Sequence, residues 1–218
     1  MDFECTMKQG VYTEFETEKF LKKYAKVARH YLVKTWYDCE KASRKLGYPL
    51  VLKIMSKDAL HKSDIHGVRL VRDRRDLEDE FNSLVKIVKR RKLKFDGVLV
   101  QEYIEGQYLL IGLKEDASFG HAIALGAGGV YTEFLKDVTF RVCPISLKDA
   151  DEMIKELRMK DQLYGVRGEK GVDVKLLKNV LVNISKIPTK YPEIKELDIN
   201  PFIINSRGGK VVDARMVI

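Results

Sequence analysis

The chain has 218 residues, of which 45% are hydrophobic and 33% charged, a balance that allows a buried core and excludes a wholly disordered protein. Lysine and arginine number 40 against 32 aspartate and glutamate residues, which gives a formal net charge of +8. No apolar run approaches the roughly 20 residues of a membrane span, and the first residues lack the basic-then-apolar pattern of a secretory signal. Three cysteines without CxxC spacing predict neither a disulfide framework nor a zinc site. We therefore expect a cytoplasmic protein with no membrane partner.

The densest basic run covers residues 89–94, and a second basic cluster covers residues 72–75. A nucleic-acid-binding protein gathers such residues on one face, often with aromatic side chains that stack on bases. Here acidic residues are interleaved through most of the chain, and no aromatic residue lies within the basic run. The pattern favours a solvated face, an acidic substrate or a protein partner, and nucleic-acid binding is the distant alternative.

The first half of the chain predicts three helices and a pair of strands. The spacing of apolar residues and the positions of glycine and proline predict helices over residues 18–26, 39–46 and 77–88. Strands are predicted over residues 50–54 and 68–71, paired as a hairpin or as near neighbours.

The second half is richer in strands. We predict strands over residues 98–104, 109–113, 121–125, 194–199 and 210–215. Helices are predicted over residues 147–157, with Ser146 as N-cap, and over residues 174–184. The fold class is therefore α+β, and a helix-rich and a strand-rich half meeting near residue 96 predict two lobes around a cleft.

Gly126, Gly128 and Gly129 form a glycine-rich loop directly after an apolar predicted strand. Glycines let backbone N–H groups approach phosphate oxygens closely. The loop is neither a Walker loop nor a dinucleotide fingerprint, since no Lys-Ser/Thr follows it and no helix clearly begins there. A phosphate site and a tight turn that needs positive φ both remain open.

A polar loop over residues 60–68 holds His61 and His66, two of the four histidines. A neutral imidazole can attack a phosphoryl group, and a loop can carry it between two sites. Histidines that merely fill an exposed polar turn are the simpler interpretation of the composition alone.

The third group of polar residues is acidic and lies near the C-terminus. Alternation along a strand places Glu196, Asp198 and Asn200 on one face, and Asp213 reaches the same side if the last strand pairs with this one. Such oxygen ligands suit Mg²⁺ that carries nucleotide phosphates, because Mg²⁺ then needs only one or two protein ligands. A solvated face of an antiparallel hairpin explains the pattern equally well.

Seven motifs follow one another in a recognisable order: GYPLVLK (47–53), LHKSD (60–64), GAGG (126–129), FLKDV with Arg141 and Pro144 (from 134), RGE (167–169), ELDINP (196–201) and VDARM (212–216). Together they resemble the ATP-grasp, or β, subunit of archaeal ADP-forming acetyl-CoA synthetase, also called acetate–CoA ligase (ADP-forming). The resemblance covers about residues 15–218. It implies an N-terminal extension (1–14), a first ATP-grasp lobe with a phosphohistidine loop (15–95) and a second lobe with the glycine-rich turn and the Mg²⁺-binding strands (96–218).

The resemblance also implies site residues. Those implied to bind nucleotide are Lys53, Gln101, Glu102, Tyr103, Ile104, Gly126, Gly128 and Gly129. His61 matches the transiently phosphorylated histidine, Asp198 is a further acidic residue of the catalytic site, and Asn200 and Asp213 match the Mg²⁺ ligands. The implied reaction converts acyl-CoA, ADP and phosphate reversibly to acid, CoA and ATP. A separate CoA-binding α subunit is implied as partner, in a heterotetramer of two α and two β chains.

Two residues depart from the family pattern. His66 precedes Gly67 where the family usually has two glycines, and Tyr108 stands where a glutamate would serve the ribose. These departures motivate an alternative function, a degenerate ATP-grasp subunit that binds nucleotide or partner for regulation without turnover.

Overall fold

The computed structural model describes residues 8–56, 58, 65–129, 137–166, 168 and 170–218. These residues form two compact units, one of residues 28–104 and one of residues up to 27 together with residues 105–218. The chain thus leaves the larger unit after Val27 and returns to it at Glu105.

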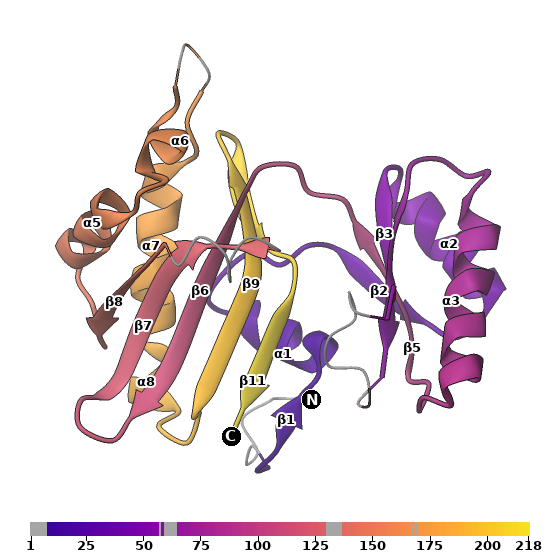
Figure 1. Ribbon diagram of the computed structural model, residues 1–218, viewed down its shortest axis with the longest axis horizontal. Coiled ribbons are helices and arrows are strands. Elements are labelled where there is room, and N and C mark those ends of the chain that lie inside the picture. The colour runs from indigo at the N-terminus through magenta and orange to yellow at the C-terminus, as the bar shows by residue number, and fades with distance from the viewer. Residues whose placement is uncertain (1–7, 57, 59–64, 130–136, 167, 169) are drawn as a thin grey trace. The chain divides into compact units, whose positions relative to one another are not determined.

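The smaller unit is a four-stranded antiparallel sheet with two helices. Its strand order is β2 (His30–Val33), β5 (Gly97–Glu102), β3 (Leu50–Met55) and β4 (Val68–Val71). Helices α2 (Trp36–Leu46) and α3 (Leu77–Arg91) lie on the same face of this sheet (Figure 1). The predicted hairpin of residues 50–54 and 68–71 is confirmed as the pair β3–β4.

The core of this unit follows from the alternation along β3. Leu50, Leu52 and Ile54 are fully buried and pack in one cluster with Phe81 and Leu84 of α3. Because successive side chains of a strand point to opposite faces, Lys53 lies on the face turned away from these helices.

The larger unit is built on a seven-stranded antiparallel sheet. Its order is β1 (Val11–Tyr12), β11 (Ala214–Val217), β9 (Glu196–Asn205), β6 (Gln107–Asp116), β7 (Gly120–Ala127) and β8 (Val138–Val142), with β10 (Gly208–Val211) paired to β9. Its helices are α1 (Glu14–Leu21), α5 (Leu147–Glu156), α6 (Lys160–Tyr164), α7 (Val174–Ser185) and α8 (Ile187–Lys190).

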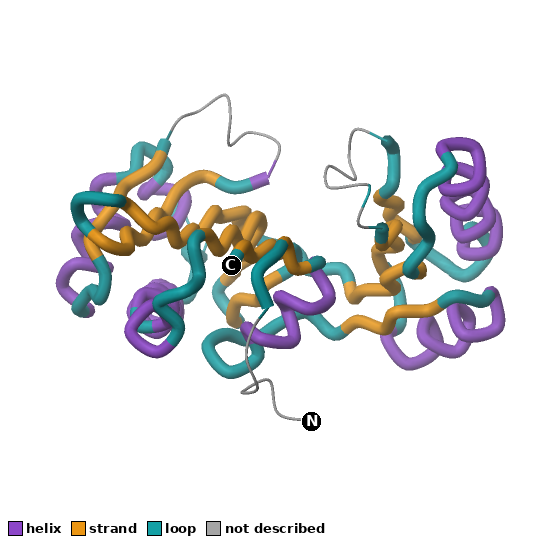
Figure 2. Tube along the Cα trace, turned by 90° about the horizontal axis from the view of Figure 1, so that it is seen from below, coloured by secondary structure: helices purple, strands orange, loops and turns teal. Residues whose placement is uncertain are grey.

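Buried side chains of all five helices form one apolar cluster with one face of this sheet, on which Leu109, Ile111, Leu197 and Ile199 lie. Figures 1 and 2 show the helices α5, α7 and α8 gathered on that side of the strands. The other face therefore presents the alternate residues of the same strands, and the candidate site lies there.

Local capping explains where two helices begin. Ser146 caps α5 in a capping box with Asp149, as the sequence predicts. Thr13 forms the same motif with Glu16 and starts α1 at Glu14, so the predicted helix over residues 18–26 was placed too late in the chain.

Two predicted boundaries differ from the structure. Residues 97–102, assigned by sequence to the second lobe, form β5 and pair with β2 and β3 of the smaller unit, while residues 15–27 belong to the larger one. The predicted strand 210–215 is divided into β10 and β11, and Asp213 lies between them. The division arises because β10 pairs with the second half of β9 and β11 with its first half.

Within the described residues, no helix is both long and apolar enough to cross a lipid bilayer.

Candidate functional site

The acidic residues of β9 and β11 meet on the open face of the larger sheet. Asp198 lies opposite Arg215 in the antiparallel register, and the backbone N–H of Asn200 donates to the carbonyl oxygen of Asp213 at 3.1 Å. Residues opposite each other in such a pair point to the same face. The predicted grouping of Glu196, Asp198, Asn200 and Asp213 on one face therefore agrees with the strand register.

Burial and like charge change the acidity of this group. The pKa of the Asp198 carboxyl is raised to about 6, chiefly by desolvation and also by the negative charges of Glu196 and Asp213, while the charge of Arg215 acts in the opposite direction. Carboxylates that repel one another favour a bound cation, which would relieve the repulsion. In the described part of the chain, no three His, Cys, Asp or Glu residues form a metal-binding group. The donors nevertheless fit Mg²⁺, because a nucleotide-bound Mg²⁺ needs only one or two protein oxygens.

The glycine turn, defined here as Gly126–Gly129, is packed against its neighbours. A Cβ on Gly126 would lie 2.7 Å from the carbonyl oxygen of Asp137, and a Cβ on Gly128 would lie 2.5 Å from the carbonyl carbon of Leu109. Gly129 has φ 74°, in the left-handed region. Close packing and positive φ thus account for these glycines, and binding of phosphate by the turn stays a prediction.

The glycine turn is joined to the acidic strands by a side-chain contact. The N–H of Gly129 donates to Oδ1 of Asn200 at 2.8 Å, and the N–H of Gly128 donates to the carbonyl oxygen of Tyr108 at 2.8 Å. Asn200 therefore belongs both to the acidic group and to the turn, so a ligand bound there would meet both.

In the smaller unit, the candidate nucleotide residues lie on β3 and at the end of β5. The Lys53 side chain is 5% exposed and Gln101 is fully buried. Glu102 accepts from Nε of Arg29 at 2.9 Å and from the Arg29 backbone N–H at 2.7 Å, so its carboxylate is held by an ion pair. Tyr103 is exposed and Ile104 half-buried where the chain leaves this unit.

His61 lies outside the described residues, so its predicted role is not tested by the structure. His66 is described, and its φ of 54° is one that glycine adopts at little cost. His66, at a position where the family usually has glycine, thus keeps a backbone conformation typical of glycine. This geometry favours a turn residue at position 66.

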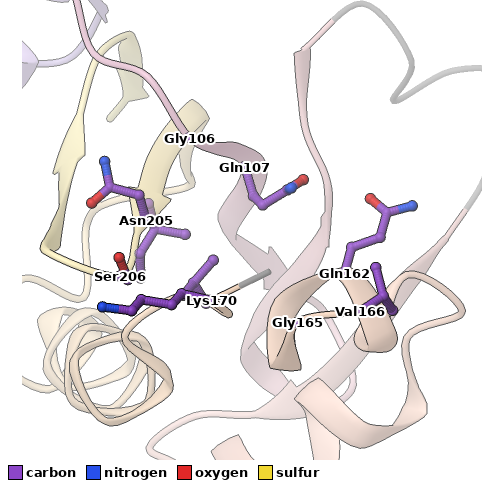
Figure 3. Close-up of a pocket in the computed structure, with 10 residues that line it drawn as sticks. Gly106, Gln107, Gln162, Gly165, Val166, Lys170, Asn205 and Ser206 are labelled. Atoms are coloured by element: carbon purple, nitrogen blue, oxygen red, sulfur yellow. The ribbon is translucent and has the colours of Figure 1, made fainter. Parts of the chain in front are cut away.

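Two cavities of the larger unit differ in their relation to these residues. One of about 220 Å³ is lined by Gly112, Ala124 and Phe140 and by the carboxylates of Glu196 and Asp198, so it adjoins the acidic group. The other, of about 350 Å³, lies between the start of β6, the end of β9 and the chain after α6 (Figure 3). Lys170 and Ser206 lie on one side of it and Gln162 and Val166 on the other, and it contains none of the predicted site residues.

Sequence reasoning missed two neighbours of the site. Arg215 faces Asp198 and lowers its pKa, and its position two residues after Asp213 was a usable signal once the strand register was known. The ring of Tyr108 would be 3.3 Å from a Cβ on Gly129, so the residue noted as a departure packs against the glycine turn.

Comparison with known proteins identifies the family of this chain. The profile of the ATP-grasp domain family matches residues 5–218. Acetate–CoA ligase (ADP-forming) I of Archaeoglobus fulgidus is 42% identical over 81% of this chain, but the chain spans only 26% of that relative's length. The β subunit of acetate–CoA ligase (ADP-forming) I of Pyrococcus furiosus is 35% identical over 94% of this chain and 90% of its own length.

Among solved structures, the acetyl-coenzyme A synthetase 1 of Candidatus Korarchaeum cryptofilum in complex with coenzyme A and Ca-AMPCP has a TM-score of 0.90 at 38% identity, over 95% of this chain and 93% of that chain. A second structure of that enzyme holds coenzyme A and Mg-AMPPCP, with its phosphohistidine segment pointing towards the nucleotide binding site. It has a TM-score of 0.83 at 36% identity, over 95% of this chain and 92% of that chain.

Proposed function

This chain belongs to the ATP-grasp domain family, among the relatives of the β subunits of ADP-forming acetate–CoA ligases, and on this premise we propose that it is the nucleotide-binding β subunit of an acyl-CoA synthetase. The reaction is acyl-CoA + ADP + phosphate giving acid + CoA + ATP, reversibly. The observation that carries the proposal is the match to the Pyrococcus furiosus β subunit over nearly the whole of both chains.

Nucleotide contacts are proposed separately for each unit. Lys53 would offset the charge of the nucleotide phosphates, and Gln101, Glu102, Tyr103 and Ile104 would line the adenine side. The glycine turn would border the phosphate oxygens, because residues without a side chain allow their close approach. The place of Lys53 on β3, at the end of the motif GYPLVLK, supports its role.

Asn200 and Asp213 would hold Mg²⁺ through their side-chain oxygens. Bound Mg²⁺ would supply charge neutralisation at the diphosphate, which phosphoryl transfer requires. Asp198, whose pKa lies near 6, would add a carboxylate to the region where the phosphoryl group is accepted. Its oxygens would orient the hydrogen-bond donors beside it. The pairing of β9 with β11 supports this assignment, since the hydrogen bond from Asn200 to Asp213 continues it and brings the three residues to one face.

His61 would relay the phosphoryl group. A bond from its imidazole nitrogen to phosphorus would form as the N–P bond of an α-subunit phosphohistidine breaks. That bond would then break as the terminal oxygen of ADP takes the phosphoryl group, which yields ATP. The phosphohistidine segment of the Korarchaeum enzyme, which points to the nucleotide site in one structure, supports a movable histidine here.

The proposed partner is a CoA-binding α subunit, in an assembly of two α and two β chains. Support comes from the lengths of the relatives: the chain spans only 26% and 30% of the Archaeoglobus fulgidus and Nitrosopumilus maritimus ligases. Such longer relatives carry additional sequence in the same chain, and we propose that the corresponding part lies here on a separate subunit.

Labelling with radioactive ATP tests the relay. The assembled enzyme is incubated with [γ-³²P]ATP and Mg²⁺, and acid-labile, base-stable label on this chain is measured for the unmodified protein, His61→Ala and His66→Gly. We expect His61→Ala to lose at least 95% of the label and His66→Gly to keep it. Undiminished label in His61→Ala would remove the role of His61.

The same experiment distinguishes the catalytic subunit from the degenerate-subunit alternative. Tyr108, the departure that motivates this alternative, packs on Gly129 of the glycine turn. A regulatory subunit would bind Mg-ADP, as followed by calorimetry, yet would take up no label in the assembled enzyme.

A further inference from the structure

The inward-facing row of β8 is polar where an apolar row would be ordinary. Asp137, just before the strand, Thr139 and Arg141 alternate along it and all contact the helical layer. The hydroxyl of Thr139 lies 3.4 Å from the carbonyl oxygen of Met153 in α5, and Arg141 pairs with Glu156 at 2.5 Å. The edge strand β8 and the residue before it are thus tied by three polar side chains to α5 and to the segment between α5 and α6.

Asp137 is the most completely bonded member of this row. Its carboxylate oxygens accept from the backbone N–H groups of Arg158 and Met159, at 2.8 and 2.9 Å. The residue is only 9% exposed. A buried carboxylate that accepts hydrogen bonds from two backbone N–H groups holds the backbone of its own residue in place. Movement of that residue would leave the carboxylate and both N–H groups without hydrogen-bond partners.

The main chain of Asp137 in turn contacts the glycine turn. Its carbonyl oxygen accepts from the N–H of Ala127 at 3.0 Å. The same oxygen occupies the space that a Cβ on Gly126 would need, at 2.7 Å. The carboxylate therefore sets the position of one wall of the turn, while Tyr108 and Asn200 hold it from β6 and β9.

We propose that Asp137 is a positioning residue for nucleotide binding, one that holds the glycine turn in the shape that receives phosphate. It touches no phosphate itself and acts through Ala127 and its neighbours. The inference rests on the proposed function, since the turn is a phosphate site only in that function. Arg141, four residues along the same face, pairs with Glu156 of α5 but lies away from the turn and provides the matched control.

The test compares Asp137→Asn with Arg141→Met in the full chain. Asparagine keeps the shape of the side chain, but its amide N–H₂ would oppose one of the two backbone donors. We expect Asp137→Asn to raise the dissociation constant for Mg-ADP at least tenfold and to leave that for adenosine within twofold, as measured by calorimetry. Arg141→Met should leave both within twofold, even where the two variants lose similar thermal stability. Equal effects of the two variants on Mg-ADP binding would overturn the proposal.

Hydrogen exchange tests the positioning without nucleotide. In the free chain, the amides of Ala127 and Gly128 should exchange at least tenfold faster in Asp137→Asn and within twofold of the unmodified rate in Arg141→Met. A chain that binds no Mg-ADP but shows this exchange pattern refutes the proposed function alone, and unchanged exchange refutes the positioning role.

If Asp137→Asn does not fold, the proposal is tested by hydrogen exchange on the unmodified chain with and without Mg-ADP. Mg-ADP should raise the exchange protection of the Arg158 and Met159 amides at least tenfold, because these donors are linked to the turn through Asp137. Unchanged protection of both amides on binding would overturn the proposal.

Discussion

Asp198 makes the stability of the larger unit dependent on pH. Burial, together with the charges of Glu196 and Asp213, raises the pKa of its carboxyl from 3.8 to about 6. The folded chain therefore binds more protons than the unfolded chain between about pH 4 and pH 6, and stability falls as the pH rises through that window. Asp198→Asn removes this loss, so we expect the variant to be more stable at pH 7 by up to about 3 kcal/mol and no more stable near pH 4. Urea denaturation with a metal chelator at the two pH values measures the difference.

Glu115→Gln is the control, since Glu115 is an exposed carboxylate at the far end of β6. It should not remove the fall in stability between about pH 4 and pH 6. A pH profile of Asp198→Asn that follows the unmodified protein would contradict the assignment of the raised pKa to the acidic group.

At the same scale, the sequence predicted which residues share the site face but not how they are bonded. Period-two alternation placed Asp198 and Asn200 correctly, because it follows from strand geometry alone. The bond from Gly129 to Asn200 and the two donors on Asp137 join residues from 21 to 71 positions apart. Only the register of distant strands and helices brings such pairs together, and no local pattern encodes it.

Helix α3 ends on a residue that is not suited to its backbone. Lys92 has φ 53° and forms the left-handed C-cap, with its N–H donating to the carbonyl oxygens of Lys89 and Val88. Glycine adopts this conformation at little cost, whereas other residues lose about 1–2 kcal/mol. We therefore expect Lys92→Gly to raise the free energy of unfolding by about 1 kcal/mol, as measured by denaturation with urea.

The matched change within the same helix has the opposite sign. Lys86→Gly, at an exposed interior position of α3, should lower the free energy of unfolding by about 1 kcal/mol. If both glycine variants shifted stability in one direction, the C-cap geometry of Lys92 would not be the cause.

Element prediction succeeded where the signal was local. The apolar spacing of α3, the Ser146 cap of α5 and the strand β3 are all encoded within a dozen residues and are confirmed. It failed for short strands such as β1, β2 and β8, whose pairing partners supply most of their stability. Residues 138–142 carry exposed valines and a phenylalanine on one face and a polar row on the other, a pattern inverted from that of an ordinary half-buried strand.

At the scale of the molecule, the smaller unit has a core of its own. Its buried cluster, which includes Leu52, Phe81, Leu84 and Val100, contains only residues between 33 and 100. Domains with a separate core can fold alone. We expect a polypeptide of residues 28–104 to unfold cooperatively, as followed by circular dichroism.

Leu52→Ala should lower the stability of that polypeptide by about 2–5 kcal/mol, because it leaves a cavity at a fully buried position. Lys41→Ala, at an exposed position of α2, should have little effect. A non-cooperative thermal transition of the unmodified polypeptide would show that the unit depends on the rest of the chain.

The division into units was the hardest feature to predict. The change of texture near residue 96 suggested a boundary there, but the strand that begins at Gly97 completes the first sheet by pairing with β2 and β3. The composition of a segment can indicate that it forms a strand, but it does not indicate which sheet that strand joins, because this depends on pairing with distant strands. The chain therefore changes unit at Glu105, after β5 has ended.

The ion pair between Arg29 and Glu102 gains significance from this boundary. The backbone N–H of Glu102 donates to the carbonyl oxygen of Arg29 at 2.9 Å, and their side chains pair as well, so the smaller unit is closed by contacts close to both of its ends. A segment whose two ends already contact each other can be inserted into a loop of another protein with little strain at the junction. For the same reason it can be replaced by the corresponding segment of a relative. Chimeras spliced between positions 28 and 104 should consequently exchange one part of the protein without unravelling the other.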